Sequence, residues 1–331
     1  MKKVLVYDVA AESSGAKAVL EKYIEAFRKD GASFYYVVTS VLDYPSSENA
    51  EFIKLKWCKK SWLHRLYCDY VYMPRLIKKL NIDEIFSLQN IILPIRGLKQ
   101  TVLVHNAIPF TDHRFSLFSD SFLFIYQNLI GHLIKKSCKK ADKIIVQTKW
   151  MKKKISELCK LPLTKIELEK REEIRALSAE NERIKSDIPT FFYPAMPFSY
   201  KNHRVILEAC RNLKNSGITD FKVVFTFTGD ENKLAGKIKS IIQAEKLPIE
   251  LISTLNRKAM DEMYRKSVLL FPSYLETVGL PLLEAQAFRA KIIAADCAYS
   301  REALENYEAE FFDYTSAEAL ALKMRGVIHE N

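Results

Sequence analysis

The stretch that most constrains the fold is residues 268–286, VLLFPSYLETVGLPLLEAQ. Its apolar start predicts a buried strand, because short apolar runs bounded by turn residues suit the centre of a parallel sheet. A Pro-Ser turn follows, and Pro281 suits the first turn of a helix. The sequence therefore predicts a strand, a loop and a helix N-terminus in succession.

Two carboxylates flank this predicted loop, Glu276 before the helix and Glu284 on its first turns. Free N–H groups and the positive end of the helix dipole suit a phosphate, while carboxylates accept hydrogen bonds from sugar or ribose hydroxyls. This arrangement suits a nucleotide sugar. On spacing alone, two chance glutamates in a loop before a core helix remain an alternative.

The segment from Glu276 to Glu284 resembles the E-x7-E signature of retaining glycosyltransferases of the GT-B type, in particular the large family 4 (glycosyl transferases group 1). The resemblance implies that Glu276 lies at the donor sugar and that Glu284 binds the ribose. It also implies that backbone amides between them meet the diphosphate, those of Thr277, Val278, Gly279 and Leu280.

The N-terminal half predicts a parallel sheet of its own. Residues 3–9, KVLVYDV, form an apolar run for a buried strand, and Gly15 enters the following helix. The resemblance implies that Gly15 approaches the donor phosphates, with an ordinary tight turn as the alternative. Further strands are expected at 34–39, 84–88, 101–104 and 143–147, with helices at 61–80, 121–138 and 148–158.

His105 follows the predicted strand 101–104, at the edge of the sheet where ligands bind in such folds. The resembled family commonly has a histidine there near the reacting sugar, so we expect His105 to be catalytic; a structural histidine is the alternative. The next segment, 111–136, is rich in aromatic residues and is interpreted either as a lipid-touching acceptor loop or as core.

The second half opens with an expected strand at 190–195 and a helix near Lys201, Asn202 and His203. This resembles the family's arginine, short loop and lysine-glycine-histidine element, in which arginine and lysine neutralise the diphosphate. Lys201 fits that role, but Ala195 and Met196 stand where the arginine is expected. A solvated lysine at a helix start is the alternative. Residues 223–232 predict a strand that ends at Gly229, beside the nucleotide, with Asp230 as a helix cap.

The predicted fold class is thus α/β, with two Rossmann-like doubly wound domains facing each other across a cleft (GT-B). The expected domains are 1–165, an acceptor-binding domain, and 189–331, a nucleotide-sugar-binding domain, joined by a charged linker or helix at 166–188. Family members usually continue for a few dozen residues with a helix that crosses back to the first domain, and this sequence ends at Asn331.

The formal net charge of the whole chain is +11, and its basic residues are concentrated in the first half. Residues 135–154 hold nine lysines and one acid, and residues 51–80 mix eight Lys or Arg with Trp and Tyr. Such patches suit anionic membrane surfaces, nucleic acid or phosphorylated substrates, and the interleaved aromatics favour a membrane. A solvated basic face is the alternative. The six dispersed cysteines and the absence of a long apolar run predict a cytoplasmic protein that binds peripherally to the inner face of the plasma membrane.

The expected function is hexosyl transfer from a nucleotide-diphosphate sugar to an acceptor hydroxyl, with a lipid-linked saccharide of lipopolysaccharide, O-antigen or capsule synthesis as acceptor. No D-x-D dyad stands at a strand end, so no metal or other cofactor is expected. Lys201, the helix dipole and backbone amides would balance the phosphate charge instead. The alternatives are an inactive GT-B homologue, another sugar-nucleotide enzyme such as an epimerase, and a basic membrane- or nucleic-acid-binding protein. We expect no nucleic-acid partner.

Overall fold

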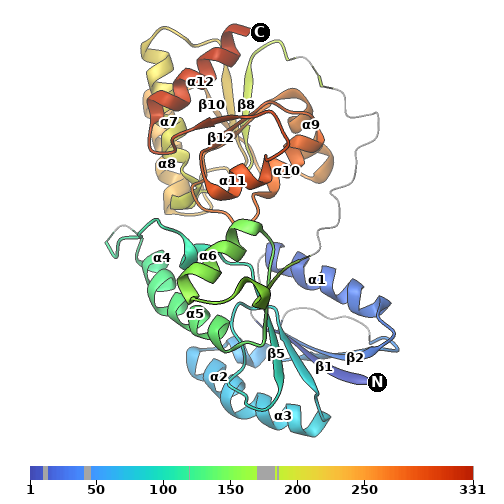
Figure 1. Cartoon of the computed structure of the whole chain (residues 1–331). Coiled ribbons are helices and arrows are strands. Elements are labelled where there is room, and N and C mark those ends of the chain that lie inside the picture. The colour runs from blue at the N-terminus through green and yellow to red at the C-terminus, as the bar shows by residue number, and fades with distance from the viewer. Residues whose placement is uncertain (10–13, 41–45, 119, 170–182, 185, 331) are drawn as a thin grey trace. The chain divides into compact units, whose positions relative to one another are not determined.

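The chain forms two compact units, Met1–Lys170 and Arg171–Asn331. The computed structural model describes residues 1–9, 14–40, 46–118, 120–169, 183–184 and 186–330. Each unit is a parallel sheet with helices packed on its faces (Figure 1). The prediction of two Rossmann-like α/β domains is therefore confirmed.

The first unit contains a seven-stranded sheet in the order β3-β2-β1-β4-β5-β6-β7, with every pair parallel. The strand order reverses between β1 and β4, and ligands bind beyond the carboxyl ends of strands at such a point. The strands are β1 (Lys2–Asp8), β2 (Ser33–Thr39), β3 (Ala50–Lys54), β4 (Glu84–Ser87), β5 (Lys99–Val104), β6 (Lys143–Val146) and β7 (Ile166–Leu168).

Helices of the first unit follow the predicted ranges, with one recurrent difference. The expected helices at 61–80 and 121–138 each contain one π-helical segment, η2 and η4, where the turn widens. The helices are α1 (Ser14–Lys29), α2 (Trp62–Tyr67), η2 (Cys68–Tyr72), α3 (Met73–Leu80), α4 (Ser121–Ile125), η4 (Tyr126–Ile130), α5 (Gly131–Lys140) and α6 (Lys149–Cys159), with 3-10 turns η1 (Lys56–Lys59), η3 (Ile108–Phe110) and η5 (Leu163–Lys165).

The second unit repeats this design with a six-stranded parallel sheet in the order β10-β9-β8-β11-β12-β13. Here the order reverses between β8 and β11. Its strands are β8 (Thr190–Tyr193), β9 (Lys222–Phe225), β10 (Ile249–Leu251), β11 (Val268–Phe271), β12 (Ile292–Ala295) and β13 (Glu310–Phe312); its helices are η6 (Ser199–Lys201), α7 (His203–Asn215), α8 (Lys233–Glu245), α9 (Arg257–Lys266), α10 (Leu280–Ala287), α11 (Ala298–Ala303) and α12 (Ala317–Glu330).

The sequence analysis expects the charged linker to begin at residue 166, but the first sheet extends to residue 168. Residues 166–168 form β7, an edge strand that pairs with β6, because Ile166 is fully buried against the sheet. The remainder of the range 166–188 is described only at 169, 183–184 and 186–188. β3 was also not predicted: its residues 50–54 lie at the opposite edge, where only one neighbouring strand constrains the sequence.

Both faces of each sheet are buried, as the apolar runs predict. In β1, Leu5 and Tyr7 pack into one cluster and Val6 into another, because alternate side chains of a strand point to opposite faces. The second unit has an aromatic core, in which Tyr193 packs edge-on against Phe271 with ring centroids 5.8 Å apart. Phe225 lies 6.3 Å from the same Tyr193 ring, so the aromatic rings of β8, β9 and β11 pack as one layer.

Gly279 provides a test of the backbone at the start of α10. Its φ is +74°, and an added Cβ would lie 3.1 Å from Leu282 Cδ1 and 3.3 Å from the Tyr299 ring. We expect Gly279→Ala to lower the free energy of unfolding by about 1–2 kcal/mol in urea denaturation. Gly326→Ala is the matched control: nothing lies within 4 Å of its added Cβ in α12, and we expect a gain of about 0.5–1 kcal/mol. Equal effects of the two changes would contradict the interpretation.

Candidate functional site

Lys201 lies at the end of η6, in the connection that leaves β8. The buried Tyr193 hydroxyl donates to the Lys201 carbonyl oxygen at 2.8 Å. Asn202 follows with φ +55°, and its side-chain amide donates to the carbonyl oxygens of Pro272 at 3.3 Å and Tyr314 at 2.9 Å. Asn202 occupies the place of the glycine in the resembled lysine-glycine-histidine element, and asparagine tolerates this left-handed backbone better than most residues.

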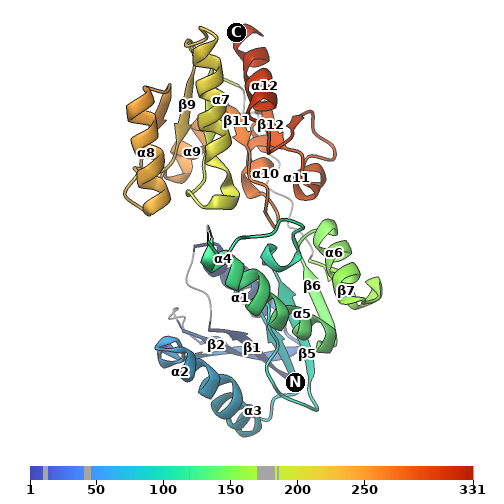
Figure 2. The ribbon, with the colours of Figure 1, turned by 90° about the vertical axis from the view of Figure 1, so that its left-hand side faces the viewer.

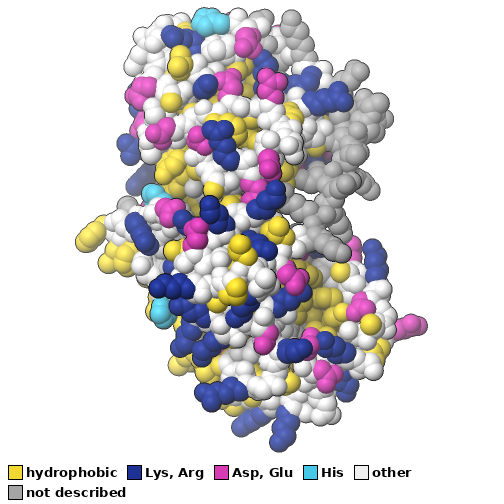
Figure 3. Space-filling model, viewed as in Figure 1, with side chains coloured by type: hydrophobic (Ala, Val, Ile, Leu, Met, Phe, Trp, Pro, Cys, Tyr) yellow, Lys and Arg dark blue, Asp and Glu magenta, His cyan; other side chains and the backbone are white. Residues whose placement is uncertain are grey.

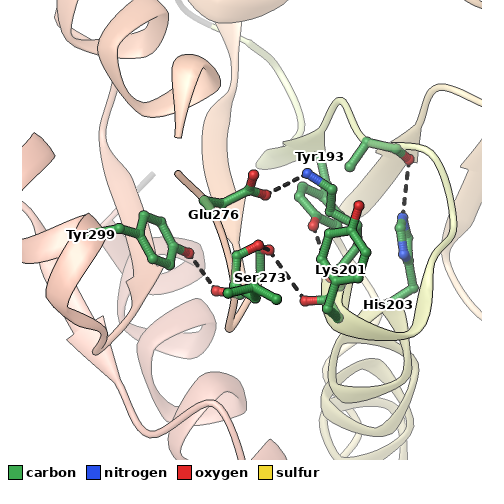
Figure 4. A network of polar contacts seen from close by, with 9 residues as sticks. Tyr193, Lys201, His203, Ser273, Glu276 and Tyr299 are labelled. Carbon is green, nitrogen blue, oxygen red and sulfur yellow. Dashed lines mark hydrogen bonds and ion pairs between the residues drawn. The ribbon is translucent and has the colours of Figure 1, made fainter. Parts of the chain in front are cut away.

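Glu276 lies beyond β11, in a loop that is hydrogen-bonded to the η6 connection (Figure 4). The Ser273 hydroxyl donates to the Tyr200 carbonyl oxygen at 3.2 Å, and Tyr274 N–H donates to the same oxygen at 3.0 Å. The buried Tyr299 hydroxyl donates to the Ser273 carbonyl oxygen. These bonds hold the β11 loop in register with the loop that carries Lys201.

Lys201 and Glu276 form an ion pair across these two loops, the ammonium donating to Glu276 Oε1. Their side chains are only 19% and 16% exposed. The Lys201 ammonium also lies 5.5 Å from the centre of the Tyr200 ring. Because β8 and β11 are the strands between which the order reverses, the pair lies at the point where this fold binds ligands.

The N-terminus of α10 follows directly. Gly279 is its N-cap in a left-handed conformation, and Pro281 lies in the first turn as predicted. Within the residues that the structure describes, no protein group accepts a hydrogen bond from the N–H of Val278, Gly279 or Leu280. These donors and the helix dipole are therefore available to an anion.

Glu284, on α10, is held by two side chains of α9. Arg257 Nη1 donates to Glu284 Oε1 and the Tyr264 hydroxyl donates to Oε2, both at 2.7 Å. Burial, reinforced by the Glu284 carboxylate, raises the pKa of Tyr264, so this hydroxyl stays a donor. Each carboxylate oxygen retains a further lone pair, so Glu284 is oriented and can still accept hydroxyl groups.

Gly229 lies in the loop beyond β9 with φ +101°, and an added Cβ would collide with the Lys239 side chain. Its N–H donates to Glu231 at 2.9 Å, and Thr228 N–H donates to the same carboxylate at 2.7 Å. Desolvation is the largest single influence and raises the pKa of Glu231, but the backbone N–H bonds and the Thr228 hydroxyl together outweigh it and lower that pKa to about 2. The predicted cap Asp230 is wrong: Asn232 is the N-cap of α8 and accepts from Ala235 N–H at 2.9 Å, because only its side chain reaches the first turn.

His203 is a buried histidine at the start of α7, directly after the loop that carries Lys201. Its ring nitrogen Nε2 contacts the Ala195 carbonyl oxygen at 3.2 Å, and its ring lies 4.7 Å from that of Tyr193. Burial lowers the pKa of His203 to about 3, with the Ala195 bond opposing the shift and Lys201 adding to it. His203 is therefore neutral at pH 7 and supports the turn between β8 and α7.

The first unit holds the other two predicted site residues. His105 follows β5, and Asn90, after β4, accepts from the N–H of His105 at 2.8 Å and of Asn106 at 3.1 Å. Burial lowers the pKa of His105, opposed by the carboxylate of Glu169 beyond β7, so the imidazole is neutral at pH 7. Gly15 is the second residue of α1, which follows β1.

The structure thus brings Lys201, Glu276 and the amides at 278–280 to one edge of the second sheet. Sequence reasoning did not assign a positioning role to Tyr193, Asn202, Ser273 and Tyr299, which hold the two loops, or to Arg257 and Tyr264, which orient Glu284. Asn202 alone carried a local signal, as a substitute for glycine. Among the described residues, no group of three or more His, Cys, Asp or Glu side chains could hold a metal ion.

Two Rossmann-like units, each a parallel sheet with helices on its faces, are the architecture of the GT-B fold. The family described as glycosyl transferases group 1 matches residues 175–331, nearly the whole second unit. That match covers just under half of the chain, and the chain as a whole has the fold of GT-B glycosyltransferases. A comparison with curated protein sequences gave no match.

Solved structures agree on the fold. A glycosyltransferase from Rickettsia africae ESF-5 is 18% identical with a TM-score of 0.65, over 99% of this chain and 88% of that one. WaaG, a glycosyltransferase involved in lipopolysaccharide biosynthesis, is 13% identical with a TM-score of 0.69, over 99% and 90%. HepE of Anabaena in complex with UDP-glucose is 10% identical with a TM-score of 0.67, over 100% and 90%.

The ion pair can be tested by a double-mutant cycle of Lys201→Met and Glu276→Gln. Because each single change leaves a poorly solvated partner, we expect each to lower the free energy of unfolding by about 1–3 kcal/mol, and the double variant to lose less than the sum by about 1 kcal/mol. The exposed pair Arg204–Glu208 is the control, with an expected coupling below about 0.5 kcal/mol. Equal couplings in both pairs would show that Lys201 and Glu276 do not depend on each other.

His203 makes stability depend on pH. Its pKa is lower in the folded chain, about 3, than the ordinary value of about 6.5 in the unfolded chain. The contribution of His203 to the free energy of unfolding is therefore fully present well above pH 6.5. It is lost as the pH falls towards 3, because the unfolded state binds the proton. Between pH 7 and pH 5 we expect His203 to account for a loss of about 2 kcal/mol, seen as a flatter urea-stability profile in His203→Gln. The exposed His329→Gln is the control, and a profile for His203→Gln as steep as that of the wild type would contradict the assignment.

Proposed function

We propose that the chain is a retaining glycosyltransferase that moves a hexose from a nucleotide-diphosphate sugar to an acceptor hydroxyl. The observation that carries the proposal is the Lys201–Glu276 pair beside the N–H groups of Val278, Gly279 and Leu280, for which the described part of the chain shows no protein acceptor. These groups lie at one edge of the sheet and suit such a donor. The cation and the backbone amides suit the diphosphate, and the carboxylate suits the hydroxyl groups of the sugar. The UDP-glucose complex of HepE, which has the same fold, supports this class of donor.

Each residue has a distinct proposed role. The N–H groups of residues 277–280 and the Lys201 ammonium receive the diphosphate, and Glu276 accepts hydrogen bonds from the sugar hydroxyls. Glu284, oriented by Arg257 and Tyr264, accepts the ribose hydroxyls. Gly15 and Gly229 allow the backbone to approach the nucleotide, and His105 acts at the transferred sugar.

The chemical step follows from these roles. The bond between the sugar C1 and the diphosphate oxygen breaks, the acceptor oxygen bonds to C1 on the face that the diphosphate leaves, and the acceptor proton passes to the departing diphosphate. Negative charge then grows on the leaving diphosphate, where Lys201 and the α10 dipole stabilise it without reorganising. We propose that this positive charge takes the place of a metal ion, so that no metal or other cofactor is required.

We further propose a lipid-linked saccharide as acceptor, in the synthesis of a surface polysaccharide at the cytoplasmic face of the membrane. Of two proteins with the same fold, WaaG is described as involved in lipopolysaccharide biosynthesis and WaaB as a lipopolysaccharide outer core galactosyltransferase. Among the described residues, no helix is both long enough and apolar enough to cross a bilayer. The alternative of an inactive homologue rests on Ala195 and Met196, which stand where the family's arginine is expected.

Thermal stabilisation by nucleotide diphosphates and their sugars tests the donor site. A ligand that binds only the folded state at about 100 times its Kd should raise the Tm by about 5 °C or more. We expect one base to do so, with the shift lost in Glu284→Ala, reduced in Tyr264→Phe and kept in the exposed control Glu308→Ala. Absence of a shift with every nucleotide would overturn the proposed donor site.

The catalytic proposal needs a separate readout. With the stabilising donor, we expect transfer to an acceptor without added metal and in the presence of EDTA, and NMR of the product should show the anomeric configuration of the donor. Nucleotide binding without transfer or donor hydrolysis would favour the inactive homologue. An inverted product would refute the retaining assignment while leaving the donor site in place.

A further inference from the structure

The turn that follows β4 places Asn90 against the end of β5 in the first unit. Asn90 N–H donates to the Leu103 carbonyl oxygen of β5 at 3.2 Å, and the Ser87 hydroxyl donates to the Ile91 carbonyl oxygen at 2.6 Å. β4 lies between β1 and β5 in the sheet, and both of these neighbours are labelled in Figure 2. The turn is therefore fixed at the carboxyl edge of the sheet, where ligands bind in this fold.

The backbone of Asn90 is left-handed, with φ +65°, a conformation that glycine adopts readily and most other residues do not. Asparagine tolerates it better than most residues and adds a side-chain amide. Asn90 is only 6% exposed, so this amide needs hydrogen-bond partners within the protein. The position thus combines a backbone that would suit glycine with a polar group that glycine lacks.

Two backbone N–H groups fix the direction in which the Asn90 amide points. The N–H of His105 donates to Asn90 Oδ1 at 2.8 Å, and the N–H of Asn106 donates to the same oxygen at 3.1 Å. Because a backbone N–H only donates, the side-chain atom that meets both groups must be the oxygen of the amide and not its nitrogen. The amide nitrogen therefore lies on the other side.

The Asn90 nitrogen faces the imidazole of His105. It lies 3.3 Å from His105 Nε2, and an amide NH₂ group only donates hydrogen bonds. Nε2 must therefore accept, which leaves the proton of the neutral imidazole on Nδ1. An imidazolium would bring a second donor against the amide, so the same contact also disfavours a positively charged His105.

Burial strengthens this preference. Lys and Arg side chains are spread over the visible surface of the first unit (Figure 3), whereas Asn90 is buried and His105 is half-buried. Burial lowers the pKa of His105, opposed by the Glu169 carboxylate, so the ring is neutral at pH 7. Two donors that face each other away from water both lose their hydrogen bonds, which makes the opposite tautomer unfavourable.

We propose that Asn90 is a positioning residue that holds His105 as the tautomer with its proton on Nδ1. This role rests on the function proposed above, in which His105 acts at the transferred sugar. His105 then meets a sugar oxygen as a hydrogen-bond donor through Nδ1, and not as a base through Nε2. The chemical step proposed above needs no such base, because the departing diphosphate takes the acceptor proton.

The ring nitrogens of His105 test the proposal on the full chain without any ligand. In NMR of protein that carries ¹⁵N-labelled histidine, Nε2 is the nitrogen that couples strongly to both ring C–H protons, and the spectrum of His105→Gln identifies the His105 signals. We expect Nε2 of the wild type to be unprotonated at pH 7. Asn90→Asp should move the proton to Nε2, because a carboxylate still accepts from the two backbone N–H groups but cannot donate to the ring.

Asn81→Asp is the matched control. Asn81 is also a left-handed asparagine, but it is exposed at the end of α3, so this change should leave the His105 signals unaltered. Asn90→Gly keeps the backbone conformation and removes the amide, so it tests the contact even if the aspartate variant folds poorly. We expect it to show a mixture of the two tautomers.

A kinetic readout tests the consequence for transfer. With the nucleotide sugar that stabilises the wild type, we expect Asn90→Asp to lower kcat about tenfold, as the loss of one hydrogen bond in the transition state would. The thermal shift that the nucleotide diphosphate produces should remain, because Lys201 and Glu284 lie in the second unit.

The possible failures are distinguishable. A wild type with its proton on Nε2, or an Asn90→Asp variant whose Nε2 stays unprotonated, would overturn the tautomer assignment and leave the donor site in place. Transfer at the wild-type rate by an Asn90→Asp variant with the proton moved would overturn the positioning role. If no nucleotide stabilises the wild type, the proposed function is rejected, while the spectrum still decides the tautomer.

Discussion

The ion pair between Lys201 and Glu276 joins the two loops on which the second unit's site depends. One loop leaves β8 and the other leaves β11, the neighbouring strands at which the sheet order reverses. Parallel strands place their carboxyl ends at one edge, so residues 75 positions apart come within hydrogen-bonding distance. Because both side chains are largely buried, each charge is stable chiefly in the presence of the other.

The surrounding polar contacts keep this pair in place. Tyr193, Ser273 and Tyr299 are buried, and each hydroxyl donates to a backbone carbonyl of one of the two loops. Asn202 adds a bond to the loop beyond β11 and another to the loop beyond β13. The loops are thus fixed by the core beneath them, while the N–H groups of residues 278–280 have no acceptor among the residues that the structure describes. A rigid base with open donors is the preorganisation that electrostatic stabilisation requires.

The sequence predicted the elements that depend on local pattern. The strand, turn and helix at 268–287 follow from an apolar run, a Pro-Ser turn and Pro281, and the structure has all three. Edge strands were harder to predict, because β3 and β7 pair with a neighbouring strand on one side only. The Asp230 cap failed for a related reason: three adjacent polar residues suit a cap, and only the geometry of the turn selects Asn232.

The sequence by itself determined the two-domain α/β class and the chemical groups at the predicted donor site, because strand and helix periods and the Glu276–Glu284 spacing are local properties. Only the tertiary structure decided which charges meet, that Arg257 and Tyr264 orient Glu284, and that Asn202 holds a left-handed turn. It also decided that the aromatic segment 118–133 shows a second apolar face to the outside. These outcomes depend on contacts between residues far apart in the chain, and burial and pairing arise only when the sheets assemble.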